Sequence, residues 1–142
     1  MNVLPSPTPG GKEVFIVDDS PVVRERLANL IGELSDVSII GEADIAFEAI
    51  QTIAKCKPDI VVLDISMPGG SGLYVLEKIK KDLPAPVVIM LTNFAHEQYR
   101  QKCLQLGADH FFDKTTEFQK VLEVIRDLPS NLQLPPDSEK NP

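Results

Sequence analysis

Short apolar runs alternate with longer amphipathic segments along most of the chain. The runs begin near Val14, Val37, Ile60, Val87 and His110, spaced 23 to 27 residues apart. Between them, apolar residues recur three or four positions apart, which is the periodicity of a helix with one buried face. A strand followed by a helix, repeated five times, predicts an α/β domain.

The five strands are predicted to form one parallel sheet, because each crossover contains a helix and should be right-handed. The first, third and fourth runs are continuously apolar, as in strands that helices cover on both faces. Ser38 interrupts the second run, which favours an edge position. These features predict a flavodoxin-like, doubly wound (βα)5 fold with strand order 2-1-3-4-5.

Capping residues mark the predicted starts of four helices. They are Ser20, Asp44, Ser71 and Thr116, the last as part of a capping box. The apolar stripe of the second helix is predicted to begin at Phe47. Proline-rich segments flank the alternating region, so we expect a flexible tail over residues 1–12, a domain over 13–128 and a flexible tail over 129–142.

Composition narrows the classes of function. The 142 residues are enough for one domain with a sizeable core, and 43% of them are hydrophobic. The net charge of −7 argues against direct nucleic-acid binding, which depends on clustered Lys and Arg. No run is long enough to span a membrane. Cys56 and Cys103 are expected in separate helices as reduced thiols, and we expect the chain to be cytoplasmic.

Polar side chains follow four of the apolar runs, at the point where each run ends. Asp18 and Asp19 follow the first run, Asp64 the third, Thr92 the fourth and Lys114 the fifth. In a parallel sheet these positions share the carboxyl edge, where open α/β sheets bind ligands. We expect the five side chains to face one cleft that suits a divalent cation and a phosphoryl group.

Carboxylates this close repel each other, by about 4 kcal/mol for two charges about 4 Å apart at an effective dielectric constant of about 20. Mg²⁺ is the predicted counter-ion, because it prefers oxygen ligands and keeps waters that a phosphate oxygen can replace. Asp64 is the predicted nucleophile for an aspartyl phosphate, with its oxygens accessible above a flexible loop. Asp18 and Asp19 are predicted metal ligands, and Lys114 and Thr92 would stabilise charge on the transferred oxygens.

Four motifs, in order, resemble the phosphoacceptor receiver domain of two-component response regulators. They lie at residues 17–20, at 63–68 with Gly72, at 91–92 and at 107–114, and the resemblance covers residues 13 to about 127. It implies that Asp64 accepts a phosphoryl group from a sensor histidine kinase or a phosphotransfer protein. It also implies that Asp19, Asp64 and the backbone carbonyl of Ser66 bind Mg²⁺, with Asp18 assisting through water.

The resemblance further implies a switch. The Thr92 hydroxyl would move toward the phosphoryl group while the Phe111 ring changes its packing, and the face of the fourth helix, fifth strand and fifth helix would bind an unknown downstream protein. Thr115 follows Lys114 where many receivers have proline, which disfavours a cis peptide there, since a non-proline cis bond costs about 2.5–4 kcal/mol. Asn93 replaces a smaller residue often found beside the switch hydroxyl, which narrows access to the phosphoryl group.

Two other functions stay open at this point. An aspartate-nucleophile phosphohydrolase would need a second acid two residues after Asp64, and Ser66 stands there. An unphosphorylated interaction module of the same fold would be expected to lack one of the acids or the lysine, and none is missing. We therefore predict a signalling domain rather than an enzyme, standing alone unless the chain is a fragment of a longer regulator.

Overall fold

The computed structural model describes residues 11–67 and 71–130, and in these ranges strands and helices alternate as predicted. The strands are β1 (Lys12–Val17), β2 (Val37–Ala43), β3 (Ile60–Leu63), β4 (Val87–Thr92) and β5 (His110–Asp113). The helices are α1 (Pro21–Ile31), α2 (Ala46–Cys56), α3 (Gly72–Lys81), α4 (Glu97–Gln105) and α5 (Phe118–Asp127).

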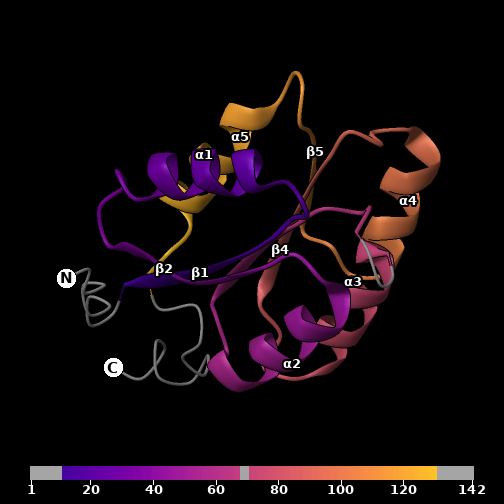
Figure 1. Ribbon diagram of the computed structural model, residues 1–142, viewed down its shortest axis with the longest axis horizontal. Helices are drawn as coiled ribbons and strands as arrows, with labels where there is room; N and C mark the ends of the chain where they lie inside the picture. Colours follow the sequence, from indigo (N-terminus) through magenta and orange to yellow (C-terminus); the bar gives the residue numbers. More distant parts are fainter. Residues whose placement is uncertain (1–10, 68–70, 131–142) are drawn as a thin grey trace, which may run out of the picture.

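The sheet has the predicted topology. All four strand pairs are parallel, in the order β2-β1-β3-β4-β5, with β2 at an edge and β3 in the centre. Helices α1 and α5 cover one face, and α2, α3 and α4 cover the other (Figure 1). Every residue of β3 is therefore buried, and Asp64 directly follows the middle strand of a three-layer sandwich.

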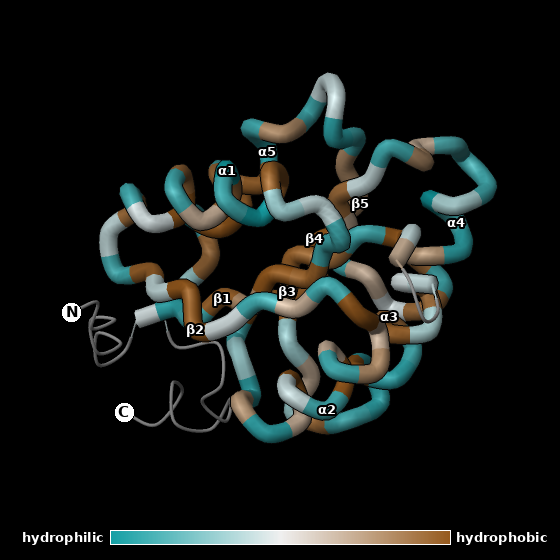
Figure 2. The backbone as a smooth tube through the Cα atoms, viewed as in Figure 1, coloured by the Kyte–Doolittle hydropathy of each residue, from teal (hydrophilic) through white to brown (hydrophobic). Residues whose placement is uncertain are grey.

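Two apolar clusters fill the spaces between the layers, and the strands appear as the hydrophobic centre of the molecule (Figure 2). Successive residues of β1 contribute to opposite clusters: Val14 and Ile16 face α1 and α5, whereas Phe15 and Val17 face the other helices. This alternation fixes the direction in which β1 ends and places Asp18 and Asp19 at the carboxyl edge of the sheet.

Two of the four predicted helix N-caps are correct. The Ser20 and Ser71 hydroxyls accept hydrogen bonds from backbone N–H groups of α1 and α3, as expected. Asp44 and Thr116 are wrong, because each lies one residue too early and the helix that follows has no side-chain cap. In α2, the start is set by Ala46, which enters the core at the first helical position.

The predicted buried stripe of α2 is also wrong at its first position. Phe47 is 64% exposed, and the residues that face the core are Ala46, Ala49 and Ile53. The stripe is displaced because alanines carry the buried face of this helix, and they give a weak hydrophobic signal beside a phenylalanine. Periodicity alone therefore placed the large side chain on the wrong side.

Strand β1 begins one residue before the expected start of the domain. Lys12 is the first residue of β1 and is buried, and its Nζ donates to the carbonyls of Ile125 (2.6 Å), Arg126 (3.0 Å) and Leu128 (2.7 Å). A cation stabilises the partial negative charge at the carboxyl end of a helix, so Lys12 links the end of α5 to β1 and stabilises both. The predicted tails lie largely outside the described residues, and none of the described helices is long and apolar enough to span a membrane.

The two cysteines should differ sharply in reactivity. Both are free thiols, Cys56 exposed and Cys103 buried, and burial raises the pKa of Cys103 to about 11. Because the thiolate is the reactive form, an alkylating reagent near pH 8 should label Cys56 quickly and Cys103 only after unfolding, or as the pH approaches about 11. Intact mass followed over time measures the rate of labelling. In the control Cys56→Ser, only Cys103 remains, so the native variant should be labelled slowly. Labelling of native Cys56→Ser as fast as that of the denatured variant would contradict the prediction.

Candidate functional site

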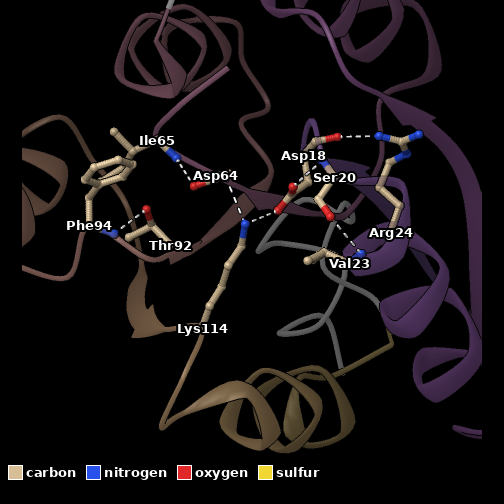
Figure 3. Close-up of polar contacts among 9 residues, drawn as sticks. All are labelled: Asp18, Ser20, Val23, Arg24, Asp64, Ile65, Thr92, Phe94 and Lys114. Atoms are coloured by element: carbon tan, nitrogen blue, oxygen red, sulfur yellow. Dashed lines mark hydrogen bonds and ion pairs between the residues drawn. The ribbon is translucent and has the colours of Figure 1, made fainter. Parts of the chain in front are cut away.

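Three of the predicted side chains meet directly at the carboxyl edge of the sheet. Lys114, after β5, places its Nζ 2.7 Å from Asp18 Oδ2 and 3.0 Å from Asp64 Oδ2, so one ammonium bridges the ends of β1 and β3 (Figure 3). The three side chains are only 9%, 3% and 6% exposed, respectively. Their predicted convergence is therefore present in the structure.

Backbone hydrogen bonds orient both bridged carboxylates. Asp18 Oδ1 accepts from the Ser20 N–H at 2.9 Å, which closes a turn around the intervening residue. Asp64 Oδ1 accepts from the Ile65 N–H at 2.7 Å. Each acid therefore uses one oxygen for its own loop and presents the other to Lys114, and the loops that follow β1 and β3 set the geometry of the pair.

The charges of the site are unbalanced toward the negative. Burial raises the pKa of Asp18; the hydrogen bond from Lys114 opposes this rise without reversing it, and the charge of Asp64 adds to it. Burial by itself would lower the pKa of Lys114, but hydrogen bonds and charge from Asp18 and Asp64 outweigh burial and raise it. With Asp19 beside them, three carboxylates share one ammonium, so the site favours a further cation.

The donor set fits a magnesium ion. Carboxylate oxygens of Asp18, Asp19 and Asp64 all lie within 4.8 Å of one another. Asp19 is exposed, and among residues 11–67 and 71–130 its carboxylate has no hydrogen bond or ion pair. Hard oxygen ligands at an open edge suit Mg²⁺, which binds few carboxylates and keeps water. Ser66 is exposed in the loop after β3, and the role of its carbonyl stays a prediction.

The side chains of the two predicted switch residues have other neighbours than the bridged carboxylates. Thr92, the last residue of β4, is fully buried, and its Oγ accepts from the Phe94 N–H at 3.0 Å (Figure 3). Phe111 is buried among the side chains of the cluster beneath α2, α3 and α4. The Lys114 backbone N–H donates to the Thr92 carbonyl at 3.0 Å. Within the described ranges, however, neither the Thr92 hydroxyl nor the Phe111 ring contacts the Asp64 carboxylate or the Lys114 ammonium through a hydrogen bond, so their switch role stays a prediction.

Asp64 is less accessible than the sequence suggested. Only 5% of it is exposed, because the start of α3 packs directly on the backbone that follows β3. The Gly72 N–H donates to the Ile65 carbonyl, and a Cβ at Gly72 would lie 1.8 Å from the Asp64 carbonyl oxygen. The expected accessibility was therefore wrong for this conformation, while residues 68–70 of the predicted loop lie outside the described ones.

Sequence reasoning missed Arg24. Its Nη1 donates to the Asp18 carbonyl at 2.7 Å, and its Nε lies 3.1 Å from Glu42 Oε1 in β2. In the sequence, Arg24 is one more charged residue on a predicted helix. The available signal was its spacing, since Arg24 lies four residues after Ser20 and so projects from the same side of the helix as the cap.

The peptide bond between Lys114 and Thr115 is trans, as the sequence favoured. Among the described residues, the cis peptide bond lies between Leu83 and Pro84.

Comparison with known proteins agrees with this geometry. Residues 14–126 match the family described as the response regulator receiver domain. The response regulator protein VraR of Staphylococcus saprophyticus is 32% identical over 114 residues, which cover 80% of this chain and 54% of that protein. The chain thus spans about half the length of the curated relatives it matches.

Solved structures of receiver domains superpose well. The response regulator domain of Thermotoga maritima CheB has a TM-score of 0.75 and 29% identity, covering 89% of this chain and 99% of that one. A DNA-binding response regulator of the LuxR family from Staphylococcus aureus has a TM-score of 0.74 and 30% identity, covering 80% and 95%. CheY from Borrelia burgdorferi, solved with CheX, beryllofluoride and magnesium, has a TM-score of 0.70 and 31% identity, covering 80% and 88%. This chain belongs to the response regulator receiver domains, the signalling domains of two-component systems.

Proposed function

We propose that Asp64 accepts a phosphoryl group from a phosphohistidine on a sensor histidine kinase or a phosphotransfer protein, in a reaction that depends on Mg²⁺. One observation carries the proposal: the Asp64 carboxylate lies 3.0 Å from the Lys114 ammonium and within 4.8 Å of two further acids. A nucleophilic carboxylate beside groups that bind anionic oxygens and a metal is suited to forming an acyl phosphate. The magnesium and beryllofluoride complex of the related CheY supports the choice of metal.

The chemistry exchanges one partner of Lys114 for another. An Asp64 oxygen forms a bond to phosphorus while the P–N bond of the donor breaks, and the electron pair returns to the imidazole nitrogen, which takes a proton from solvent. Lys114 then pairs with a transferred oxygen in place of the carboxylate oxygen it holds now. Asp18, Asp19, Asp64 and the Ser66 carbonyl would hold Mg²⁺, which supplies positive charge for the phosphoryl oxygens.

The output proposed for this receiver, residues 13–128, is a protein contact on the face of α4, β5 and α5. Thr92 is linked to that face, because its Oγ accepts the N–H of Phe94, whose ring meets Tyr99 edge-on at 6.3 Å between centroids. Both rings are partly exposed. If the hydroxyl turns toward a phosphoryl group on Asp64, that bond is lost and Phe94 is released. We propose a cytoplasmic protein partner rather than nucleic acid, since the net charge is −7.

Amide chemical shifts with and without beryllofluoride and Mg²⁺ test this function. We expect residues 94–118 to shift in the wild type and no binding in Asp64→Asn. Thr92→Ala should bind the analogue while its shifts around Phe94 and Tyr99 largely vanish, whereas Thr52→Ala, on α2, should behave as the wild type. Binding to Asp64→Asn, or shifts confined to α1 in the wild type, would contradict the proposal.

A further inference from the structure

Arg24 connects two strands beside the metal-binding edge. From the first turns of α1, its guanidinium donates to the Asp18 carbonyl at 2.7 Å and pairs with Glu42 of β2 at 3.1 Å (Figure 3 shows the bond to Asp18). The Arg24 side chain is only 19% exposed, so the fork is held mostly within the protein. Since guanidinium nitrogens have a fixed planar arrangement, binding Glu42 through one nitrogen fixes the direction of the other.

The carbonyl that Arg24 binds belongs to the peptide unit joining Asp18 to Asp19. A peptide unit is planar, so holding its oxygen limits rotation on both sides and restricts the backbone of Asp19. On the other side, the Ser20 N–H binds the Asp18 carboxylate and closes the turn that contains Asp19. The Asp19 carboxylate has no bonded partner among the described residues, so the positions that its oxygens can reach depend on the direction that this backbone gives the side chain and on the side-chain rotamers.

We propose that Arg24 is a positioning residue for magnesium, and that it keeps the Asp19 carboxylate within reach of Asp18 and Asp64. Glu42, in turn, keeps Arg24 in place. The inference rests on the proposed function, because it concerns the same metal site. Arg24 and Glu42 would not be metal ligands, but they would control the affinity of the site for Mg²⁺.

Electrostatics and positioning predict opposite effects for the loss of Arg24. A positive charge close to an acidic site repels a divalent cation, so charge alone predicts tighter Mg²⁺ binding when Arg24 becomes neutral. The positioning role predicts weaker binding, because the peptide unit before Asp19 is released. The sign of the change in affinity therefore separates the two.

Calorimetric titration of the unphosphorylated protein with Mg²⁺ measures this sign. Removing a residue that orients a metal ligand commonly weakens affinity about 10- to 100-fold, and we expect Arg24→Met to fall near the lower end. Arg26→Met is the matched control, since it removes the same charge from the same helix but from a residue that stacks on Phe118. We expect it to bind Mg²⁺ as tightly as the wild type or slightly more tightly.

Two further variants keep the test decisive. Glu42→Ala should weaken Mg²⁺ binding in the wild type and have no further effect in Arg24→Met, because Glu42 acts through Arg24. If Arg24→Met does not fold, as judged by its amide spectrum, Arg24→Lys replaces it; this variant keeps the charge but lacks the planar fork, and we expect a several-fold loss of affinity. Unchanged or tighter binding in the folded Arg24 variants would overturn the role of Arg24 alone. A wild type that binds no Mg²⁺ would overturn the metal site as well.

Discussion

Replacing Lys114 with methionine is expected to slow phosphorylation of Asp64 by about 100- to 1,000-fold, the usual cost of removing one preorganised charge-stabilising group. Asp64 stays the nucleophile, so the variant should still take one phosphoryl group when incubated long enough with a small-molecule donor and Mg²⁺. The variant therefore separates the role of the Lys114 ammonium from that of Asp64, the acceptor. The initial rate of labelling, followed by intact mass, checks it, and an unchanged rate would contradict it.

The same variant should be less stable without Mg²⁺. Lys114 is the ion-pair partner of two largely buried carboxylates, and removing one partner of such a pair costs about 3–5 kcal/mol in the free energy of unfolding. The folded state raises the pKa of Lys114, so its stabilising contribution is present below the ordinary lysine pKa of 10.5 and disappears as pH rises through the raised value. Denaturant melts at neutral pH should show the loss, partly restored by Mg²⁺, whereas Lys55→Met, an exposed control, should change little.

Gly72→Ala is expected to be the most damaging small substitution. The added Cβ would lie 1.8 Å from the Asp64 carbonyl oxygen and 2.9 Å from the Ile65 Cα, both backbone atoms that no rotamer change can move. Overpacking commonly costs about 1–3 kcal/mol, and we expect the upper end or beyond, because α3 must shift away from β3. A small displacement of the Asp64 carboxylate should also slow phosphorylation, because a positioning error near 1 Å can lower a reaction rate about 100-fold.

Denaturant melts and labelling rates of Gly72→Ala should be compared with those of Gly32→Ala. Gly32 follows α1 with a right-handed backbone (φ −62°), a conformation that alanine adopts readily. Its Cβ would meet the Ala28 carbonyl oxygen at 3.0 Å, which is a tight contact but not a clash. We expect Gly32→Ala to stay within about 1 kcal/mol of the wild type. Equal stability of Gly72→Ala and the wild type would show that α3 does not pack on the Asp64 backbone as described.

The sequence predicted most of the fold because the fold depends on repeated, local signals. The uninterrupted apolar runs at β1, β3 and β4 and the serine in β2 were sufficient for the strand order, since only a few topologies keep crossovers right-handed. Helix boundaries were predicted less well. Asp44 is a good capping residue by type, but burial of Ala46 decided where α2 begins, and sequence periodicity does not register a three-dimensional constraint of that kind.

The strand topology was sufficient to predict which residues meet at the site. Parallel strands bring their carboxyl ends together, so the sequence pattern groups Asp18, Asp64 and Lys114. The burial of Asp64 could not be predicted, because it depends on how closely α3 approaches. The bond from Arg24 to a backbone carbonyl was equally hidden, since a sequence pattern carries no information about peptide orientation.

The central claim is that Asp64 is the phosphoryl acceptor and that Mg²⁺ is required. The most direct measurement is intact mass after incubation with a phosphoramidate donor, followed by reduction of the acyl phosphate and peptide mapping of the modified residue. We predict one phosphoryl group per chain on Asp64 in the presence of Mg²⁺, none in excess chelator, none in Asp64→Asn, and wild-type labelling in Asp44→Asn, an exposed control at the same edge of the sheet. Labelling that persists in Asp64→Asn or in chelator would contradict the account.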